Sequence, residues 1–514
     1  MEKYPIGIQT FEVIRKGKMK YVDKTGFVYK LANGTKNNFL SRPRRFGKSL
    51  LVSTLQAYFE GRKDLFEGLA ISELEKEWTT YPVIHLDLSI GKYYRIDNLY
   101  STLNMLLGRY EKELGITPDP QSSYGTRMSN IITTTVSSTG RQAVVLIDEY
   151  DAPMLDSISE PELQGHIRNV MRDFFSPLKA NEGDLRFVFL TGITKFSQLS
   201  IFSELNNIVN VSMEDDFDAI CGMTKQEVLD NFHDGIQQLA DANGMTFDEA
   251  VEALRVKYDG YRFSPHGTKI YNPYSLLNAM RSRELNSYWF STGTPTFLLE
   301  LLQEKNILIP QLESIVAPAR RFDAPTEQAS DPIPVLYQSG YITIKDYRNG
   351  MYVLGFPNEE VREGFCSSML SYISPDYRDE SDSFAWNFGE AMRADDIDTA
   401  MDALRVFLAG FPYDIHHNRE DYYQAILYTI FETLNFTIRA EVRATKGRMD
   451  LLVQTRTSVF VMELKLDHSA DEALKQIESK EYAFPYKCDG RKVFKVGISF
   501  STKERNVTEW KVAE

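Results

Sequence analysis

Three consecutive residues near the N-terminus, Gly47-Lys48-Ser49, could bind nucleotide phosphates. They follow an apolar run and a basic loop, FLSRPRRF, and they open a helical pattern, as in a phosphate-binding loop. The Lys48 ammonium would reach the β- and γ-phosphates, and the Ser49 hydroxyl would bind Mg²⁺. Backbone N–H groups would wrap the phosphates along the residues Arg44, Arg45, Phe46, Gly47, Lys48, Ser49 and Leu50. Because Arg42 stands where the usual first glycine belongs, this motif alone is a weak signal.

A second chemical group ends the apolar stretch AVVLIDEYD at residues 143–151. A buried parallel strand would deliver its acids at the carboxyl edge of a sheet. We expect Asp148 to hold Mg²⁺, directly or through water, and Glu149 to polarise the attacking water. The next apolar strand, RFVFLTG at 186–192, ends where a polar sensor residue would lie beside the γ-phosphate. Thr191, Thr194 and Lys195 are the candidates for this role, or Thr191 merely caps the following segment. Together the motifs predict binding of ATP and Mg²⁺.

The third group lies near the C-terminus in GRMDLLV and VFVMELK. The pattern predicts a β-hairpin with strands 449–453 and 459–465, in which Asp450 lies opposite Glu463 to within one residue. Glu463 and Lys465 are two apart and project from one face of their strand. Two carboxylates and an ammonium there predict a divalent-metal site, with Lys465 orienting a water. The alternative is an exposed, salt-bridged strand face, but the apolar flanks favour burial of the charges.

A chain of 514 residues is too long for one hydrophobic core, so we expect the elements that position these groups to form several domains. We expect residues 1–215 to form the nucleotide-binding domain, 216–380 a helical, winged-helix-like middle region, and 381–514 the metal-binding α/β domain. The N-cap of a helix over 98–114 is predicted at Asp97 or Asn98. Residues 317–334 are predicted to be a surface loop, 374–383 a polar linker and 494–500 the last strand.

The composition limits the classes of protein. No apolar run reaches the length of a membrane span and the N-terminus has no signal-peptide pattern, so a cytoplasmic, membrane-free protein is expected. The net charge of −14 argues against a protein that coats nucleic acid by bulk charge, but leaves room for a local basic groove. The three cysteines, Cys221, Cys366 and Cys488, fit neither a disulfide framework nor a metal site.

Several longer motifs resemble one bacterial family. They are YPIGIQTF, YVDKT, SRPRRFGKS, LIDEYDAP, FLTGITKFSQLSIFSELNN, YDGYRF, NPYSLL, YQSGYITI and GRMDLLV with FVMELK. Together they resemble bacterial AAA-ATPase-like proteins with a C-terminal PD-(D/E)XK nuclease domain. The resemblance implies a P-loop NTPase domain with a mostly parallel sheet and a restriction-endonuclease-like terminal domain. It assigns the catalytic acids to Asp450 and Glu463, the lysine to Lys465 and a further polar residue to Gln476. The same family shares the RPRRFGK form of the loop.

The function expected from these observations is an ATP-binding and ATP-hydrolysing protein coupled to a Mg²⁺-dependent nuclease, acting on nucleic acid and most naturally on DNA. The alternative is a nucleotide-switched regulator or scaffold whose terminal domain binds nucleic acid without cleaving it. Three acids compete to complete the nuclease site: Glu420, Glu432 and Glu441. The arginine finger is not distinguished among Arg44, Arg45, Arg168 and Arg172. Self-association into a homo-oligomer is left open.

Overall fold

The structure of the protein is a computed structural model. It describes residues 3–195, 208–292, 296–305, 307–324, 331–373, 378–410, 419–434 and 436–514. Contacts divide the chain into two compact units. The first unit contains residues 1–289 and 315–358, and the second contains residues 290–314 and 359–514.

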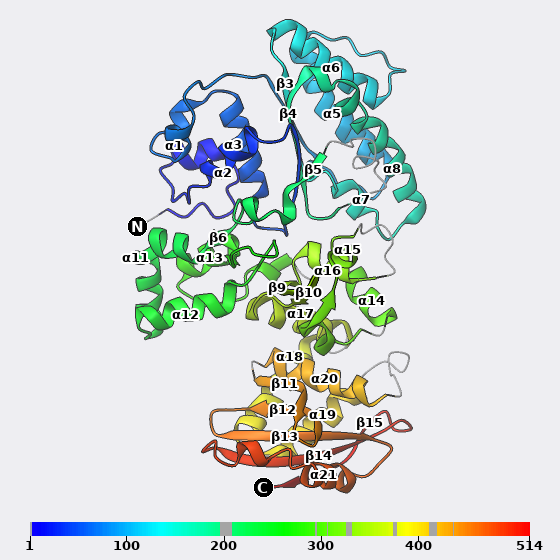
Figure 1. Cartoon of the computed structure of the whole chain (residues 1–514). Helices are drawn as coiled ribbons and strands as arrows, with labels where there is room; N and C mark the ends of the chain where they lie inside the picture. Colours follow the sequence, from blue (N-terminus) through cyan, green and yellow to red (C-terminus); the bar gives the residue numbers. More distant parts are fainter. Residues whose placement is uncertain are drawn as a thin grey trace. The chain divides into compact units, whose positions relative to one another are not determined.

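A five-stranded parallel sheet forms the centre of the first unit (Figure 1). Its strands are β1 (Asn37–Ser41), β2 (Val83–Asp87), β3 (Ala143–Asp148), β4 (Leu185–Gly192) and β5 (Ile208–Asn210). The order is β2-β3-β4-β1-β5, so β4 lies between the strand before the phosphate loop and the strand that ends in Asp148. β3 and most of β4 are buried, which explains their uninterrupted apolar sequences.

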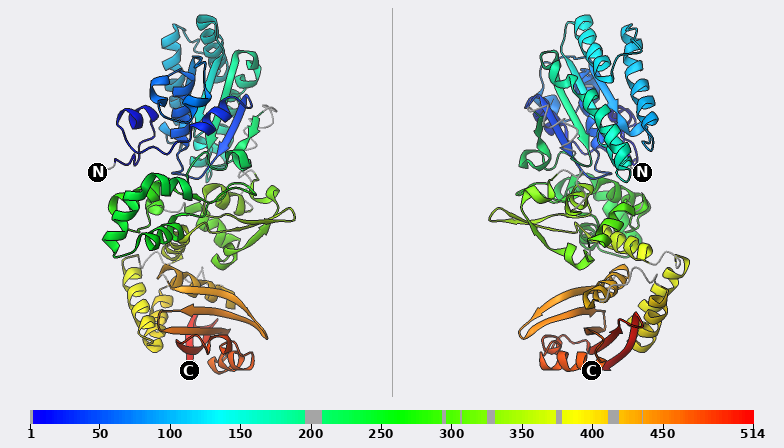
Figure 2. Two further views of the ribbon diagram at one scale, coloured as in Figure 1. Left: turned by 60° about the vertical axis from the view of Figure 1, so that its left-hand side comes forward. Right: turned by 90° about the vertical axis from the view of Figure 1, so that its right-hand side faces the viewer.

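Helices cover both faces of this sheet (Figures 1 and 2). One side carries α1 (Phe11–Lys16), α2 (Thr25–Ala32) and α3 (Lys48–Phe59), and the other α5 (Ile96–Leu114), α6 (Tyr124–Thr139) and α8 (Pro161–Phe175). Short helices α4 (Ile71–Leu74), α7 (Ala152–Asp156) and α9 (Pro177–Ala180) join them. The predicted N-cap of α5 is wrong: Arg95 is the N-cap, and Asp97 lies in the first turn, where a carboxylate favours the helix dipole.

The rest of the first unit is a helical region followed by a small sheet. The helices are α11 (Lys225–Asn243), α12 (Phe247–Tyr258) and α13 (Pro273–Ser282), and Thr224 with Glu227 forms a capping box at the start of α11. Strands β6 (Met223–Thr224) and β7 (Ile270–Tyr271) pair, and β8 (Ile315–Ala317), β10 (Met351–Gly355) and β9 (Thr343–Arg348) form a second sheet. The loop predicted at 317–334 is wrong in part, because α15 (Ala319–Phe322) forms there and α16 (Ile333–Ser339) begins at its end, while residues 325–330 lie outside the described ranges.

The second unit contains a mixed five-stranded sheet with helices. The strands are β11 (Thr437–Ala444), β12 (Gly447–Gln454), β13 (Ser458–Leu466), β14 (Lys492–Ser501) and β15 (Asn506–Ala513), in sequence order across the sheet. Only the β13–β14 pair is parallel, and α21 (Ala470–Ser479) makes the crossover between them. This helix packs so closely that a Cβ at Gly497 would lie 2.4 Å from the Ala470 carbonyl oxygen.

The other helices of this unit are α14 (Thr296–Glu304), α17 (Glu359–Ile373), α18 (Arg378–Arg393), α19 (Ile397–Ala409) and α20 (Glu420–Thr433). Two predictions need correction here. Residues 378–383 of the predicted linker are the start of α18, because a polar and acidic sequence is compatible with a helix as well as with a loop. Residues 374–377 lie outside the described ranges. The strand at 494–500 is not the last, because β15 follows it at the sheet edge.

Candidate active sites

The phosphate loop runs from the end of β1 to the start of α3. Gly47 has a left-handed backbone with φ of 91°, which a residue without a Cβ adopts without strain, and Lys48 begins the helix. The Lys48 ammonium is buried and donates to the carbonyl oxygens of Arg42 (3.0 Å) and Pro43 (3.1 Å). These bonds hold a cation at the mouth of the loop beside the N-terminus of α3, where the free N–H groups favour an anion.

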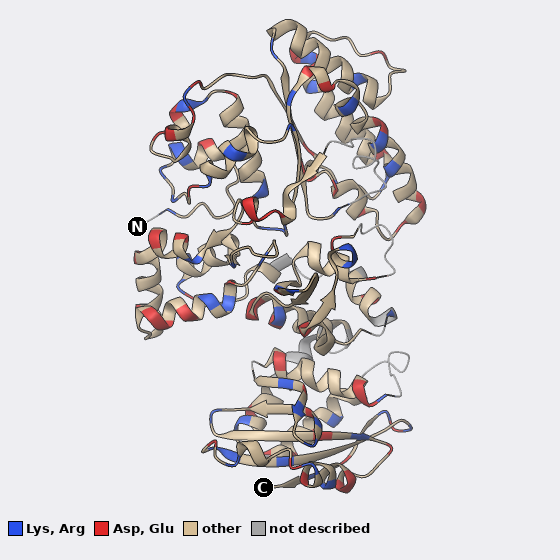
Figure 3. Ribbon diagram, in the orientation of Figure 1, with Lys and Arg blue, Asp and Glu red and all other residues tan. Residues whose placement is uncertain are grey.

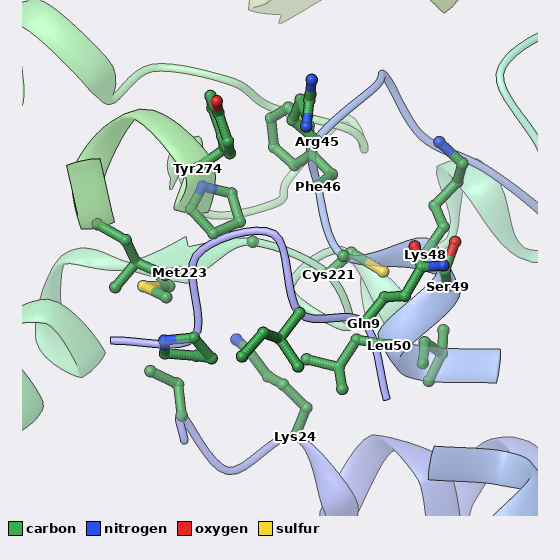
Figure 4. A pocket seen from close by; sticks show the side chains of 18 of the residues that line it. Gln9, Lys24, Arg45, Phe46, Lys48, Ser49, Leu50, Cys221, Met223 and Tyr274 are labelled. Carbon is green, nitrogen blue, oxygen red and sulfur yellow. The ribbon is translucent and has the colours of Figure 1, made fainter. Parts of the chain in front are cut away.

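A cavity of about 380 Å³ opens beside this loop. Figure 4 shows Arg45 and Tyr274 on one side, Lys24 on the opposite side, and Lys48 and Ser49 at the start of α3. The lining combines basic groups with an apolar part. The apolar part comes largely from the N-terminal segment and the helical region: Ile6, Ile8, Val22, Val28, Ile220, Met223, Phe232 and Leu277. Basic side chains on opposite sides of the cavity, together with the apolar lining, suit a nucleotide, which has charged phosphates and a largely apolar base.

The two predicted acids lie where β3 ends. Asp148 is 3% exposed, and burial raises its pKa, while the Ser49 hydroxyl and the Lys48 ammonium act in the opposite direction. Glu149 lines the cavity and has a left-handed backbone, with φ of 47°. Burial also raises the pKa of Glu149, as suits a group that accepts a proton from water.

Thr191 does not line the cavity. It is fully buried on β4, and its hydroxyl donates to the Leu40 carbonyl oxygen of β1 at 2.8 Å. In this structure the side chain therefore joins two strands, and its role as a sensor stays a prediction.

Asp151 is a residue that sequence reasoning missed. Its carboxylate is 1% exposed and accepts hydrogen bonds from the Ile193 N–H (2.9 Å), the Thr194 N–H (2.6 Å) and the Thr194 hydroxyl (2.8 Å). A Cβ at Gly192 would lie 2.4 Å from Asp151 Oδ1, so only glycine fits at this point. Asp151 thus fixes the end of β4 to the loop that carries Glu149.

Arg42, which replaces the usual glycine, has a structural role. Its guanidinium is buried and donates to the carbonyl oxygens of Ser212 (2.8 Å) and Phe217 (2.9 Å), and it lies 4.2 Å from the centre of the Phe263 ring. A glycine could make none of these contacts. They explain how a loop without its first glycine is still held in one conformation.

The other loop residues are anchored to the same region of the first unit. The buried Phe46 ring lies 4.7 Å from Tyr261 and 5.4 Å from Phe263, so only its backbone is available to a phosphate. Arg45 lies over the Tyr274 ring at 4.5 Å, and the Trp289 indole donates to the Arg44 carbonyl oxygen at 3.1 Å. The phosphate loop is therefore clamped by side chains far along the sequence.

The second site is formed by β12 and β13. Leu451 pairs with Met462, and the next step of this register sets Asp450 opposite Glu463, as the sequence predicted. The ladder ends there, and Asp450 Oδ2 instead accepts the Leu464 N–H at 2.8 Å. The Lys465 ammonium lies 3.2 Å from Glu463 Oε1, which confirms that these two side chains share a face.

The electrostatics of these carboxylates are unusual. Glu463 is 1% exposed, and burial raises its pKa to about 7, with a further rise from the charge of Asp450. Burial raises the pKa of Asp450 to about 6, opposed by the Leu464 N–H. Neighbouring carboxylates add to both shifts: Asp450 raises the pKa of Glu463, and Glu420 and Glu441 raise the pKa of Asp450. Lys465 lowers both pKa values but compensates only in part.

A divalent cation would supply the positive charge that the Asp450 and Glu463 carboxylates lack. Glu463 Oε1 accepts from Lys465 and from the Gln476 amide, whereas Glu463 Oε2 is buried and has no hydrogen-bond partner within the described residues. An unpaired buried carboxylate oxygen beside a second carboxylate suits a hard cation such as Mg²⁺. Mg²⁺ is commonly bound by one or two carboxylates together with waters and substrate oxygens, which is what Asp450 and Glu463 could provide. Across the described ranges, no group of three His, Cys, Asp or Glu side chains is placed to hold a metal ion.

The three acids that compete to complete this site occupy different places. Glu420 begins α20, and its carboxylate accepts the Leu466 N–H at 3.3 Å and lies 3.9 Å from Lys465 Nζ. Glu432, by contrast, is buried against Arg362 at 3.0 Å, near the other end of α20. The structure therefore brings Glu420, and not Glu432, to the lysine.

Glu441 is opposite Asp450 in the β11–β12 register but has a left-handed backbone, with φ of 56°. Its carboxylate is held by Arg448 and by the Gln424 amide at 3.0 Å, and the same amide donates to the Asp450 carbonyl oxygen at 2.8 Å. Glu441 is therefore linked through Gln424 to Asp450, and so lies beside the carboxylate cluster of Asp450 and Glu463.

Comparison with known proteins assigns both domains to families. Residues 5–202 match the family described as predicted AAA-ATPase, and residues 418–510 match the PD-(D/E)XK nuclease superfamily. A protein of Azotobacter chroococcum mcd 1, described as an uncharacterized protein in the vnfD 5′ region, is 34% identical over 522 residues, covering 98% of each chain. The fold and the sites define a P-loop ATPase-like domain joined to a nuclease-superfamily domain. This chain belongs to the family of AAA-ATPase-like proteins with a C-terminal PD-(D/E)XK domain, as its motifs predicted.

Solved structures overlap with the chain only weakly. The Aeropyrum pernix ORC1 protein, solved in complex with DNA, is 12% identical, with a TM-score of 0.24 over 67% of this chain and 92% of that chain. CDC6P from Pyrobaculum aerophilum is 11% identical, with a TM-score of 0.21 over 71% and 95%. TM-scores this low support no conclusion. Among the described residues, no helix combines the length and apolarity needed to cross a membrane.

Proposed function

We propose that this protein binds and hydrolyses ATP with Mg²⁺ in its first unit, and that its C-terminal domain is a Mg²⁺-dependent nuclease. The observation that carries the nuclease is the buried pair of Asp450 and Glu463 with Lys465 at 3.2 Å, in which one Glu463 oxygen has no hydrogen-bond partner in the described chain. Such a site is costly to bury unless a cation completes it.

In the ATP site, Lys48 and the N–H groups of residues 44–50 would bind the phosphates. Mg²⁺ supplied with the nucleotide would be held by Ser49 and Asp148 and would neutralise phosphate charge. Glu149, with its raised pKa and its place on the cavity wall, would orient the attacking water and accept its proton.

In the nuclease site, Asp450 and Glu463 would hold Mg²⁺, which supplies Lewis-acid stabilisation of the charge that develops on a phosphodiester. Lys465 would position the attacking water, because its ammonium already lies between Glu463 and Glu420. Gln476 donates to Glu463 Oε1 and keeps that carboxylate in one orientation.

A nucleic acid also needs cations along its backbone. Figure 3 shows Lys and Arg residues along the elements of the C-terminal domain. Arg443, Lys475 and Lys480 are exposed, and no acidic partner for them occurs in the described part of the chain. Unpaired cations release counterions from nucleic acid without first breaking an ion pair, so they favour binding in an otherwise acidic protein.

The test is cleavage of single- and double-stranded DNA and RNA with Mg²⁺, with and without ATP. We expect the wild type to cleave and Asp450→Asn to lose at least 100-fold in rate. Glu478→Gln, which changes an exposed acid of the same domain, should behave as the wild type. Nucleic-acid binding without cleavage under every condition would refute the nuclease and support the non-cleaving regulator.

The same assay tests the coupling of the two sites. Lys48→Ala should abolish ATP hydrolysis and any effect of ATP on cleavage. Cleavage rates and nucleic-acid affinity that are unchanged by both ATP and Lys48→Ala would refute the coupling and leave the nuclease in place.

A further inference from the structure

An exposed aromatic residue follows helix α21. Phe484 is 65% exposed at the start of a short 3-10 turn (Phe484–Tyr486), and the Lys487 ammonium lies over its ring at 5.6 Å. A phenylalanine ring that faces solvent gains nothing from burial, and a cation over its face draws phosphate to the same place.

The segment that carries this ring is fixed to the β11–β12 hairpin. Tyr482 is 1% exposed, and its hydroxyl accepts the Arg448 N–H (3.1 Å) and donates to the Arg448 carbonyl oxygen (2.9 Å). A Cβ at Gly447 would lie 2.6 Å from the Tyr482 hydroxyl, so the approach depends on glycine. The chain is therefore tied to β12 two residues before Phe484.

This segment is joined to the carboxylate cluster on two sides. Arg448 is two residues before Asp450 on β12, and its side chain pairs with Glu441. Helix α21 carries Gln476, which donates to Glu463, and Lys480 follows one helical turn later on the same side. Lys480 is exposed, has no acidic partner in the described part of the chain, and caps the C-terminus of α21, four residues before Phe484.

We propose that Phe484, with Lys480 and Lys487, is a stacking platform for an unpaired base of single-stranded nucleic acid next to the scissile phosphate. A base presents its flat face to an aromatic ring only where it is not stacked in a duplex, so the platform selects single strands or unpaired ends. The two lysines bind the flanking phosphates. This inference rests on the proposed nuclease function, because it names the substrate class of that site.

The experiment measures binding of a fluorescent oligothymidylate and of a duplex of equal length by anisotropy, using the full chain in EDTA so that nothing is cleaved. We expect Phe484→Ala to weaken single-strand binding about tenfold, since stacking on one aromatic residue contributes about 1–3 kcal/mol per base. Duplex binding should change less than twofold. Phe484→Trp should retain single-strand binding, because a larger ring still stacks.

Trp386→Ala is the matched control, because Trp386 is another exposed aromatic residue of the second unit, 67% exposed on α18. It should leave both affinities unchanged. Three results would each overturn the platform. Phe484→Ala could weaken single-strand and duplex binding equally, Phe484→Trp could weaken single-strand binding as much as Phe484→Ala does, or Phe484→Ala could leave single-strand binding unchanged. No binding of single strands by the wild type would overturn it as well.

These outcomes are separable from those of the proposed function. Wild-type cleavage with no effect of Phe484→Ala on binding refutes the platform alone. Loss of single-strand binding in Phe484→Ala, in a protein that never cleaves, supports the platform and refutes the nuclease.

Discussion

Asp450→Asn should stabilise the metal-free protein at alkaline pH. In the native state burial raises the pKa of Asp450 to about 6, and in the unfolded chain this carboxyl would titrate near its ordinary value of 3.8. The native state therefore holds the proton to higher pH than the unfolded state. Stability from this group is full below about pH 4 and is lost as the pH rises through about 6.

The magnitude follows from the same values. A pKa that rises from 3.8 to about 6 corresponds to about 3 kcal/mol of lost stability above pH 7. Asparagine removes the charge, and its side-chain oxygen can still accept the Leu464 N–H. For a unit of this size, 1 kcal/mol changes the melting temperature by about 2–4 °C, so we expect a rise of about 5 °C or more at pH 8.

The assay is thermal unfolding from pH 5 to pH 8, in EDTA and in Mg²⁺. The wild type should lose stability across this range in EDTA and recover it with Mg²⁺, because the cation pairs with both carboxylates. The variant should show a flatter pH profile and a smaller response to Mg²⁺, and Glu478→Gln should match the wild type. A variant that melts lower than the wild type at pH 8 in EDTA would refute the view that these charges are buried without compensation.

Other substitutions test the two sites separately. Phe46→Ala should lower the free energy of unfolding of the first unit by about 3–5 kcal/mol, because it empties the ring cluster against the loop, and urea unfolding measures this. Asp151→Ala should cost about 2–5 kcal/mol in the same experiment, since it leaves two buried N–H groups without an acceptor; a cost below 0.5 kcal/mol would contradict its role. Glu420→Gln should slow Mg²⁺-dependent cleavage at least tenfold, whereas Glu432→Gln should stay within threefold. The opposite ranking would show that the third acid is assigned wrongly.

The sequence pattern predicted those features of the sites that follow directly from the geometry of a β-strand. The alternation of residues in β12 and β13 sets Asp450 opposite Glu463, and the spacing of Glu463 and Lys465 puts both on one face. The parallel sheet was predictable for the same reason, because strands buried on both faces are continuously apolar.

Contacts between distant segments could not be predicted in this way. In the sequence, Arg42 looks like a defect in a glycine motif. Its structural role depends on hydrogen bonds to residues 212–218, some 170 positions later, which local pattern does not reveal. The unusual backbone of Glu441 was hidden too, because its strand pattern continues on either side. The linker prediction was wrong at the start of α18, because a polar and acidic sequence is compatible with both a loop and a helix.

The clamp around the phosphate loop also determines which fragments of this chain can fold. The residues that hold Arg42, Phe46 and the Arg44 carbonyl oxygen extend from Ser212 to Trp289. A polypeptide that stops at residue 215 would leave the Phe46 ring in water and the Arg42 guanidinium without the Phe217 carbonyl. The loop would lose its shape together with its partners, so the ability to bind a nucleotide is a cooperative property of the polypeptide at least as far as Trp289.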